Sequence, residues 1–246
     1  GIAGAGQSAA PQRKPPPMSD FVIPPAALPS LPVAGDSRRF PVRRIYCVGR
    51  NYADHAREMG HDPDREPPFF FSKPADTLLA GDADLPYPPQ TGDLHFEAEL
   101  VVALGAGGTD IAPADAQGLI WGYATGNDFT RRDLQAAAKK AGRPWDLAKG
   151  FDLSAACGLL HPVGQTGPLN DGRIALSVDG VIRQESDLSQ MIWPVADVIA
   201  HLSQSVRLQP GDLIFTGTPA GVGAVTRGQV VTVEIEGLTP LVTRIV

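Results

Sequence analysis

Residues 96–104 are the segment that most constrains the fold of this chain. The side chains alternate, so that in an extended strand Glu97 and Glu99 lie on one face while Phe96 and Leu100 lie on the other. A period of two is typical of a β-strand and differs from the longer period of an amphipathic helix. A strand needs partner strands, so the chain has to build a sheet around this segment.

The rest of the chain favours short strands joined by many turns. It contains 27 glycines and 24 prolines among 246 residues, which is typical of turn-rich domains rather than helical bundles. Further strands are expected at 45–48, 69–71, 212–216, 229–236 and 241–246, and a hairpin at Asp179-Gly180. Short helices are expected at 51–59, capped by Asn51, at 130–140, opened by a Thr130 capping box, and after Pro194. These patterns predict a strand-rich α+β fold.

The N-terminal region differs from the remainder. Residues 1–17 contain one large aliphatic residue, Ile2, and no aromatic residue, so we expect a disordered leader there. Residues 18–42 are rich in proline and predict an extended arm. The folded domain is expected to span residues 43–246.

Charge and cysteine content exclude several classes of protein. The net charge of −6 argues against a nucleic-acid-binding or anionic-membrane-binding protein. No run of 18 apolar residues occurs, so we expect no membrane-spanning helix. The two cysteines, Cys47 and Cys157, are too few for a disulfide scaffold or a zinc site, which favours a reducing, cytoplasmic location.

Three carboxylates suggest a cation site. Glu97 and Glu99 repel each other on one strand face unless a cation neutralises them, although a solvent-exposed acidic face is the alternative. Asp128 follows the expected strand around residues 121–125 and adds a third oxygen ligand, unless it is only a turn residue. No histidine or cysteine cluster lies nearby, which favours Mg²⁺ or Mn²⁺ over zinc.

Other polar residues could take part in chemistry. His55 and Glu58 share a face of the expected helix at 51–59, so the carboxylate could orient the imidazole as a base. A surface His–Glu pair is the commoner case. Lys149 could stabilise an oxyanion or could be an ordinary solvated lysine. The glycine-rich loop at 216–223 could hold an anionic group, but it lacks the ending of a nucleotide-binding P-loop.

Taken together, these segments resemble the fumarylacetoacetate hydrolase family. The resemblance rests on six motifs that occur in order, at residues 46–59, 71–74, 96–100, 126–135, 139–149 and 211–223. It covers residues 43–246. Within the family, the proline-rich arm and residues 65–71 are most similar to the small acylpyruvate hydrolases, including bacterial fumarylpyruvate hydrolases.

This resemblance implies a fold, a cofactor and a set of site residues. The implied fold is a mixed β-roll, or flattened barrel, with short peripheral helices, and the implied assembly is a homodimer. Mg²⁺ or Mn²⁺ would be held by Glu97, Glu99 and Asp128. The implied catalytic residues are His55 and Glu58, which lie on a lid segment, together with Lys149 and Gln135. The implied contacts to the oxo-acid end of the substrate come from Arg132, Lys73 and Thr218.

The implied activity is hydrolysis of a carbon–carbon bond in a 3-acylpyruvate. Fumarylpyruvate, an intermediate of gentisate-type aromatic degradation, would give fumarate and pyruvate. Oxaloacetate decarboxylation, 2-oxo-acid isomerisation and hydration remain alternatives on the same fold. A non-catalytic, metal-stabilised binding protein is a further alternative, but it would have no need of His55, Glu58 and Lys149 together.

Overall fold

The computed structural model describes residues 20–54 and 67–246. The predicted leader at 1–17 and the helix positions of His55 and Glu58 lie outside the described residues. In the described ranges, no helix has the length and the apolar character needed to cross a bilayer.

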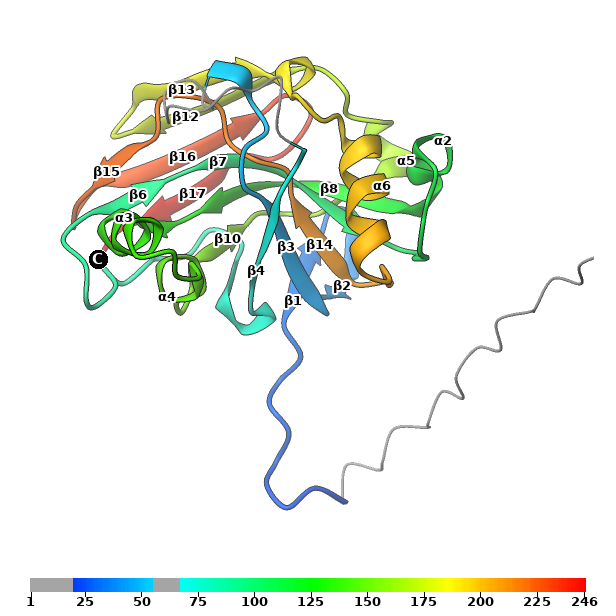
Figure 1. Ribbon diagram of the computed structural model, residues 1–246, viewed down its shortest axis with the longest axis horizontal. Helices are drawn as coiled ribbons and strands as arrows, with labels where there is room; N and C mark the ends of the chain where they lie inside the picture. The colour runs from blue at the N-terminus through cyan, green and yellow to red at the C-terminus, as the bar shows by residue number, and fades with distance from the viewer. Residues whose placement is uncertain (1–19, 55–66) are drawn as a thin grey trace, which may run out of the picture.

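An eight-stranded mixed sheet forms the centre of the molecule (Figure 1). Its strands are β3 (Arg44–Val48), β4 (Phe70–Lys73), β5 (Leu78–Ala80), β7 (Ala98–Leu104), β8 (Ile120–Asp128), β10 (Ala155–Cys157), β11 (His161–Pro162) and β14 (Asp212–Phe215). The order is β4-β3-β14-β7-β8-β10-β5, and β11 pairs with β8. Strand β14 runs parallel to β3 and antiparallel to β7. Strands from both ends of the chain therefore meet in the middle of the sheet.

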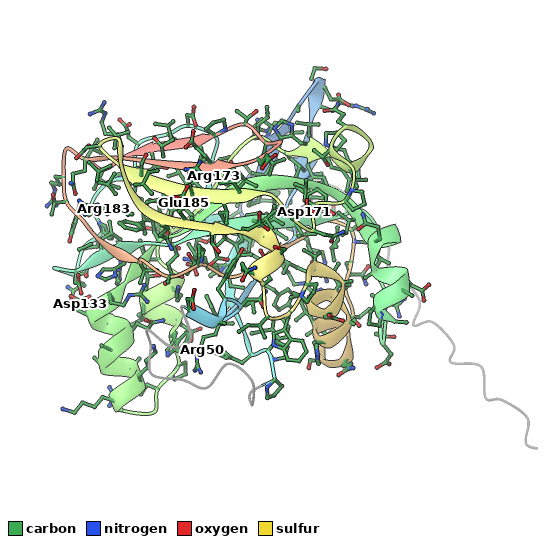
Figure 2. The ribbon with its side chains drawn as sticks, turned by 90° about the horizontal axis from the view of Figure 1, so that it is seen from above. Arg50, Asp133, Asp171, Arg173, Arg183 and Glu185 are labelled. Atoms are coloured by element: carbon green, nitrogen blue, oxygen red, sulfur yellow. The ribbon has the colours of Figure 1, made fainter. Side chains whose placement is uncertain are left out.

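Three smaller sheets surround the central one. A four-stranded sheet has the order β13 (Val181–Asp187), β12 (Arg173–Val178), β16 (Val230–Ile235) and β17 (Leu241–Arg244). A three-stranded sheet contains β15 (Gly223–Val225), β6 (Leu94–Phe96) and β9 (Thr130–Arg131), and β1 (Ser30–Val33) pairs with β2 (Asp36–Pro41). The predicted turn between β12 and β13 is confirmed, because Asp179 and Gly180 have φ values of 50° and 79°. On the exposed side of this hairpin, the Arg173 guanidinium donates a hydrogen bond to the Glu185 carboxylate (Figure 2).

The helices are few and short, as the turn-rich composition predicts. The helices with bounds in the described ranges are α2 (Pro113–Ala116), α3 (Arg132–Lys140), α4 (Asp146–Lys149), α5 (Val163–Thr166) and α6 (Val195–Ser205). In α6 the predicted apolar face is confirmed, because Val195, Val198, Ile199 and Leu202 are buried. The fold is the strand-rich α+β roll that the sequence predicts.

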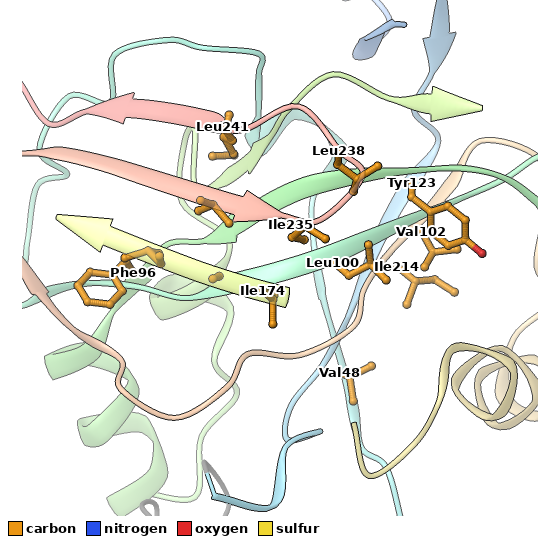
Figure 3. Packing of buried hydrophobic residues seen from close by; sticks show 14 of the residues in the cluster. Val48, Phe96, Leu100, Val102, Tyr123, Ile174, Ile214, Ile235, Leu238 and Leu241 are labelled. Atoms are coloured by element: carbon orange, nitrogen blue, oxygen red, sulfur yellow. The ribbon is translucent and has the colours of Figure 1, made fainter. Parts of the chain in front are cut away.

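The central sheet is buried on both of its faces. One face packs against the four-stranded sheet, where Leu100 and Tyr123 share a hydrophobic cluster with Ile174 and Ile235 (Figure 3). The other face forms a second cluster, which includes Val101 of β7. The strand predicted at 96–104 is therefore not half-exposed, and the alternative of a solvent-exposed acidic face is wrong.

The predicted strand at 96–104 is also interrupted. Strand β6 ends at Phe96 in the three-stranded sheet, and β7 begins at Ala98 in the central sheet. Glu97 lies between them, where its N–H donates to the side-chain oxygen of Asn127 at 2.8 Å. The chain changes sheet at the position of a candidate metal ligand.

The second half of the predicted N-terminal arm is folded. Residues 30–41 form the β1–β2 hairpin, in which Leu31 and Phe40 are buried in the second cluster. These two apolar side chains can lose contact with water only by packing on the central sheet, so this hairpin is part of the globular body. The expectation of an extended arm is wrong for this part.

One predicted helix cap is absent. The predicted Thr130 capping box does not form, because Thr130 belongs to β9 and α3 begins at Arg132 with no side-chain cap. Asp133 instead accepts hydrogen bonds from Thr91 and the Gly92 N–H. A tertiary contact thus takes the place of the local cap. The predicted helix at 51–59, whose cap would be Asn51, lies largely outside the described residues.

Candidate active site

The pairing of β7 with β8 brings the three predicted metal ligands together. Glu99 lies opposite Gly126, and the N–H of Asp128 donates to the carbonyl of Glu97 at 2.9 Å. Side-chain oxygens of Glu97, Glu99 and Asp128 all lie within 4.8 Å of one another. Glycine at 126 leaves the position opposite Glu99 without a side chain. The predicted grouping of three carboxylates is present in the structure.

All three carboxylates are buried, so their charges need compensation. Glu97, Glu99 and Asp128 are exposed by 5%, 1% and 0%. Burial, with the negative charges of Asp128 and Glu97, raises the pKa of Glu99 well above its usual value. The N–H of Gly217 donates to Glu99 at 2.9 Å and supports its charged form. Without further positive charge the site would disfavour full ionisation.

Lys149 supplies part of that charge. It ends α4, and its ammonium donates to Glu97 at 2.8 Å, Asp128 at 2.7 Å and the Thr130 hydroxyl at 2.7 Å. Burial opposes the charge of Lys149, but Asp128 and Glu97 outweigh it and raise the pKa of the ammonium. Lys149 is therefore a cation held in contact with two of the candidate metal ligands.

Lys73 is a second buried cation, at the end of β4. Its ammonium lies 2.7 Å from Asp128 and donates to the carbonyls of Phe129, Ser154 and Lys149. Burial lowers its pKa, while Asp128 offsets this in part. In this structure Lys73 contacts protein groups and holds Asp128 and the Lys149 backbone in place. The resemblance to the family implies instead that Lys73 contacts the substrate.

Arg132 and Gln135 lie together on the first turns of α3. The Arg132 guanidinium donates to Glu97 at 2.6 Å and to the Gln135 side chain at 2.7 Å. It also donates to His95, whose other ring nitrogen bonds Asp93. Burial and the Arg132 charge lower the pKa of His95, so neutral imidazole accepts from the arginine. His95 is a positioning residue that sequence reasoning missed.

The loop after β14 closes the other side of the site. The Thr218 hydroxyl accepts a hydrogen bond from Gln184, whose side-chain oxygen accepts from the Ala98 N–H of β7. The Asn51 amide donates to the Thr216 carbonyl and to Trp193. Gln184 thus ties this loop to the strand of the metal ligands, and Asn51 ties it to the segment at Trp193. The residues that flank Gln184 and Asn51 in the sequence do not predict these contacts.

The predicted site residues therefore fall into three groups. The structure gathers the three carboxylates with Lys149, Lys73, Arg132 and Gln135. Thr218 joins them through Gln184 and through the neighbouring Gly217 N–H. His55 and Glu58 lie outside the described residues.

A Gly217→Ala variant should be less stable than the wild-type protein by about 1–3 kcal/mol. Gly217 has a φ of +101°, and a Cβ there would lie 2.7 Å from the Asn51 Cβ. Relief of this clash would move the N–H away from Glu99, so Mn²⁺ affinity should fall as well. Urea unfolding and Mn²⁺ titration measure the two effects.

Gly228→Ala is the matched control for that variant. Gly228 has a similar φ of +92°, but a Cβ added there would have nothing within 4 Å of it. It should show backbone strain without the clash and leave Mn²⁺ affinity at the wild-type value. Equal stability and equal Mn²⁺ affinity of the two variants would contradict the proposed contact between the loop and Glu99.

The donor atoms of the site fit a hard divalent cation. In the described part of the chain, Glu97, Glu99 and Asp128 are the one cluster of metal-ligating side chains with this proximity, and all of the ligand atoms are carboxylate oxygens. Such donors suit Mg²⁺ and Mn²⁺ better than zinc. A cation here would also offset the desolvation that raises the pKa of Glu99.

The fold and the buried carboxylate cluster together define a β-roll protein whose buried acidic triad could bind a divalent cation. Residues 44–246 match the family described as fumarylacetoacetate (FAA) hydrolase, C-terminal. The chain belongs to the fumarylacetoacetate hydrolase family. It is therefore an enzyme of a family of carbon–carbon bond hydrolases.

Known relatives and a solved structure agree with this assignment. The chain is 43% identical over 185 residues to a fumarylpyruvate hydrolase of Ralstonia sp., a match that covers 74% of this chain and 96% of the relative. It is 41% identical over 197 residues to a mitochondrial oxaloacetate decarboxylase of Dictyostelium discoideum, covering 80% and 90%. The crystal structure of fumarylpyruvate hydrolase from Pseudomonas aeruginosa, in complex with Mn²⁺ and pyruvate, has a TM-score of 0.90 and 52% identity, covering 92% and 99%.

Proposed function

We propose that this protein is a divalent-cation-dependent hydrolase that cleaves 3-acylpyruvates, with fumarylpyruvate as its substrate. The observation that carries the proposal is the buried cluster of Glu97, Glu99 and Asp128 with Lys149 in contact. A relative of 52% identity binds Mn²⁺ and pyruvate. The relative of 43% identity is itself a fumarylpyruvate hydrolase.

In this proposal the three carboxylates hold Mg²⁺ or Mn²⁺. The bound cation supplies positive charge that stabilises the negative charge developing on the pyruvate portion. Arg132 and Thr218 bind the oxo-acid end of the substrate. Lys73 holds Asp128 in place, which is the role that its buried contacts support.

His55 and Glu58 complete the proposed mechanism. His55, oriented by Glu58, takes a proton from water, and the oxygen of that water attacks the acyl carbonyl carbon. Gln135 positions the water, and Lys149 stabilises the resulting oxyanion. When the carbonyl re-forms, the carbon–carbon bond breaks and its electron pair leaves with pyruvate as the enolate. Protonation of the enolate gives pyruvate, and the acyl portion becomes fumarate.

Oxaloacetate decarboxylation is the second candidate, because a relative of 41% identity carries that name. Decarboxylation needs no water as nucleophile. His55 is therefore required as a base for hydrolysis but not for decarboxylation. Isomerase and hydratase activities on the same fold remain further alternatives from the sequence. A cytoplasmic location and a homodimer belong to the same proposal.

The test is an assay of the purified chain with fumarylpyruvate and, separately, oxaloacetate. We expect rapid loss of the fumarylpyruvate enol absorbance with Mg²⁺ or Mn²⁺ and little after chelation, with oxaloacetate turned over more slowly. Faster turnover of oxaloacetate would favour the second candidate. No turnover of either substrate in the metal-loaded protein would contradict both, and would support a binding role.

A further inference from the structure

One face of helix α3 extends from the carboxylate cluster to a second group of cations. Arg132, Gln135 and Lys139 are spaced by three and four residues, so they share a face of the helix. All three line a cavity that also contains Glu97. The helix rise places Lys139 roughly 10 Å along the axis from Arg132. The cavity thus has a carboxylate end and a lysine end.

Lys139 lies beside other positive charges at the rim of this cavity. Its ammonium is 5.1 Å from the ring centroid of Trp145. Within the described residues this ammonium makes no hydrogen bond and no ion pair. Partial burial and the cations of Arg132 and Arg50 lower its pKa. An anion bound here would replace repulsion between cations by attraction.

Arg50 lines the same cavity from the loop that follows β3. Its guanidinium lies 4.9 Å from the Phe69 ring centroid. Arg50 and Lys139 therefore approach one region from two separate elements. A fork of guanidinium donors beside an ammonium is the usual arrangement for binding a carboxylate.

Aromatic rings separate the two ends of the cavity. Phe71 and Trp145 pack edge to face with centroids 5.7 Å apart, and both line the cavity. The Lys149 ammonium lies 5.0 Å from the Phe71 centroid, on the way to the carboxylates. The rings offer an apolar wall for a flat, conjugated chain between the two charged ends.

We propose that Arg50 and Lys139 bind a second carboxylate, at the far end of the substrate's acyl group. This inference rests on the proposed function and narrows it to acylpyruvates whose planar acyl chain ends in a carboxylate. The oxo-acid end lies at the carboxylate cluster, the acyl chain lies along Phe71 and Trp145, and the distal carboxylate lies between the two cations. Lys139 and Arg50 are specificity-determining residues in this arrangement.

Kinetics with two substrates test the assignment of Lys139. Acetylpyruvate has the same reacting centre as fumarylpyruvate but no distal carboxylate. In Lys139→Gln the ratio of kcat/KM for fumarylpyruvate to kcat/KM for acetylpyruvate should fall by about tenfold or more, through a higher KM. Arg50→Gln should lower the ratio in the same direction. Lys139→Arg, which keeps the charge, should restore most of it.

Lys140→Gln is the matched control. Lys140 is the next residue of α3 and is exposed like Lys139, but it does not line the cavity, because adjacent helix residues do not share a face. This variant removes one positive charge from the same helix, so any effect of overall charge would appear in it too. Its substrate ratio should equal that of the wild-type protein. An equal fall in Lys139→Gln and Lys140→Gln, or no fall in either, would overturn the proposal.

Calorimetry separates this proposal from the proposed function. Fumarate and crotonate have the same planar chain, but crotonate lacks one carboxylate. The Mn²⁺-loaded wild-type protein should bind fumarate more tightly, and Lys139→Gln should lose that preference. If the wild-type protein hydrolyses neither acylpyruvate, the proposed function fails while the calorimetry still decides this inference. A fumarate preference that is absent in the wild type, or retained in Lys139→Gln, would overturn it.

Discussion

A Glu99→Ala variant should bind Mn²⁺ at least about 100-fold more weakly than the wild-type protein and should not turn over fumarylpyruvate. Loss of an outer-shell partner alone costs up to about 100-fold in metal affinity, and Glu99 is one of the three proposed direct ligands. The folded state should persist, because Lys149 and Lys73 still neutralise Glu97 and Asp128. Titration with Mn²⁺ and a melting curve of the metal-free protein measure the two expectations.

Glu99→Gln and Glu234→Gln sharpen that experiment. Glu99→Gln keeps the side-chain volume and still offers an oxygen to the Gly217 N–H, so any loss reports the missing charge rather than a cavity. Glu234 lies on the exposed side of β16, and its variant should behave as the wild type. Wild-type Mn²⁺ affinity together with full activity in Glu99→Gln would remove Glu99 from the site.

A His55→Ala variant should lose acylpyruvate hydrolysis by a factor of about 10²–10⁴, which is the usual contribution of a positioned general base. Mn²⁺ affinity should hardly change, because the carboxylates that would hold the cation are elsewhere in the chain. Decarboxylation of oxaloacetate needs no activated water and should fall much less. The decisive measurement is the ratio of the two activities in each variant.

Glu58→Gln is the companion variant, since it removes the orienting charge and leaves the imidazole. It should show the same change in the ratio, but a smaller one. An equal loss of both activities in His55→Ala, with Mn²⁺ binding intact, would make His55 a general substrate-binding residue. The hydrolytic mechanism would then have no assigned base.

Much of the site could be predicted because its chemistry follows short stretches of sequence. Glu97 and Glu99 are two apart in a strand, which places both side chains on one face whatever the partner strands are. For Asp128, by contrast, the local sequence fits a turn residue as well as a metal ligand, and only the resemblance to the family favours the ligand. The β7–β8 register, which brings it beside the two glutamates, is a long-range pairing that periodicity does not reveal.

The residues that were missed act through contacts between distant segments. Gln184 joins β13 to β7 and to the loop at Thr218, and Asn51 joins two loops that follow it by more than a hundred residues. Local patterns indicate only a helix cap at Asn51 and do not reveal these contacts. Burial of Lys73 was also unforeseen, since a lysine beside a proline usually lies in a surface turn. Its position depends on Asp128 and on three carbonyls of a distant segment.

The place of β14 in the central sheet has a consequence for how the chain folds during synthesis. This strand lies between β3 and β7, yet it is encoded more than a hundred residues after both. Until residues 212–215 leave the ribosome, β3 and β7 cannot be joined, and each presents an unpaired edge. Such distant pairings close late and slowly. The nascent chain therefore depends on its last 35 residues to complete the sheet, and a chain interrupted before β14 should aggregate rather than fold.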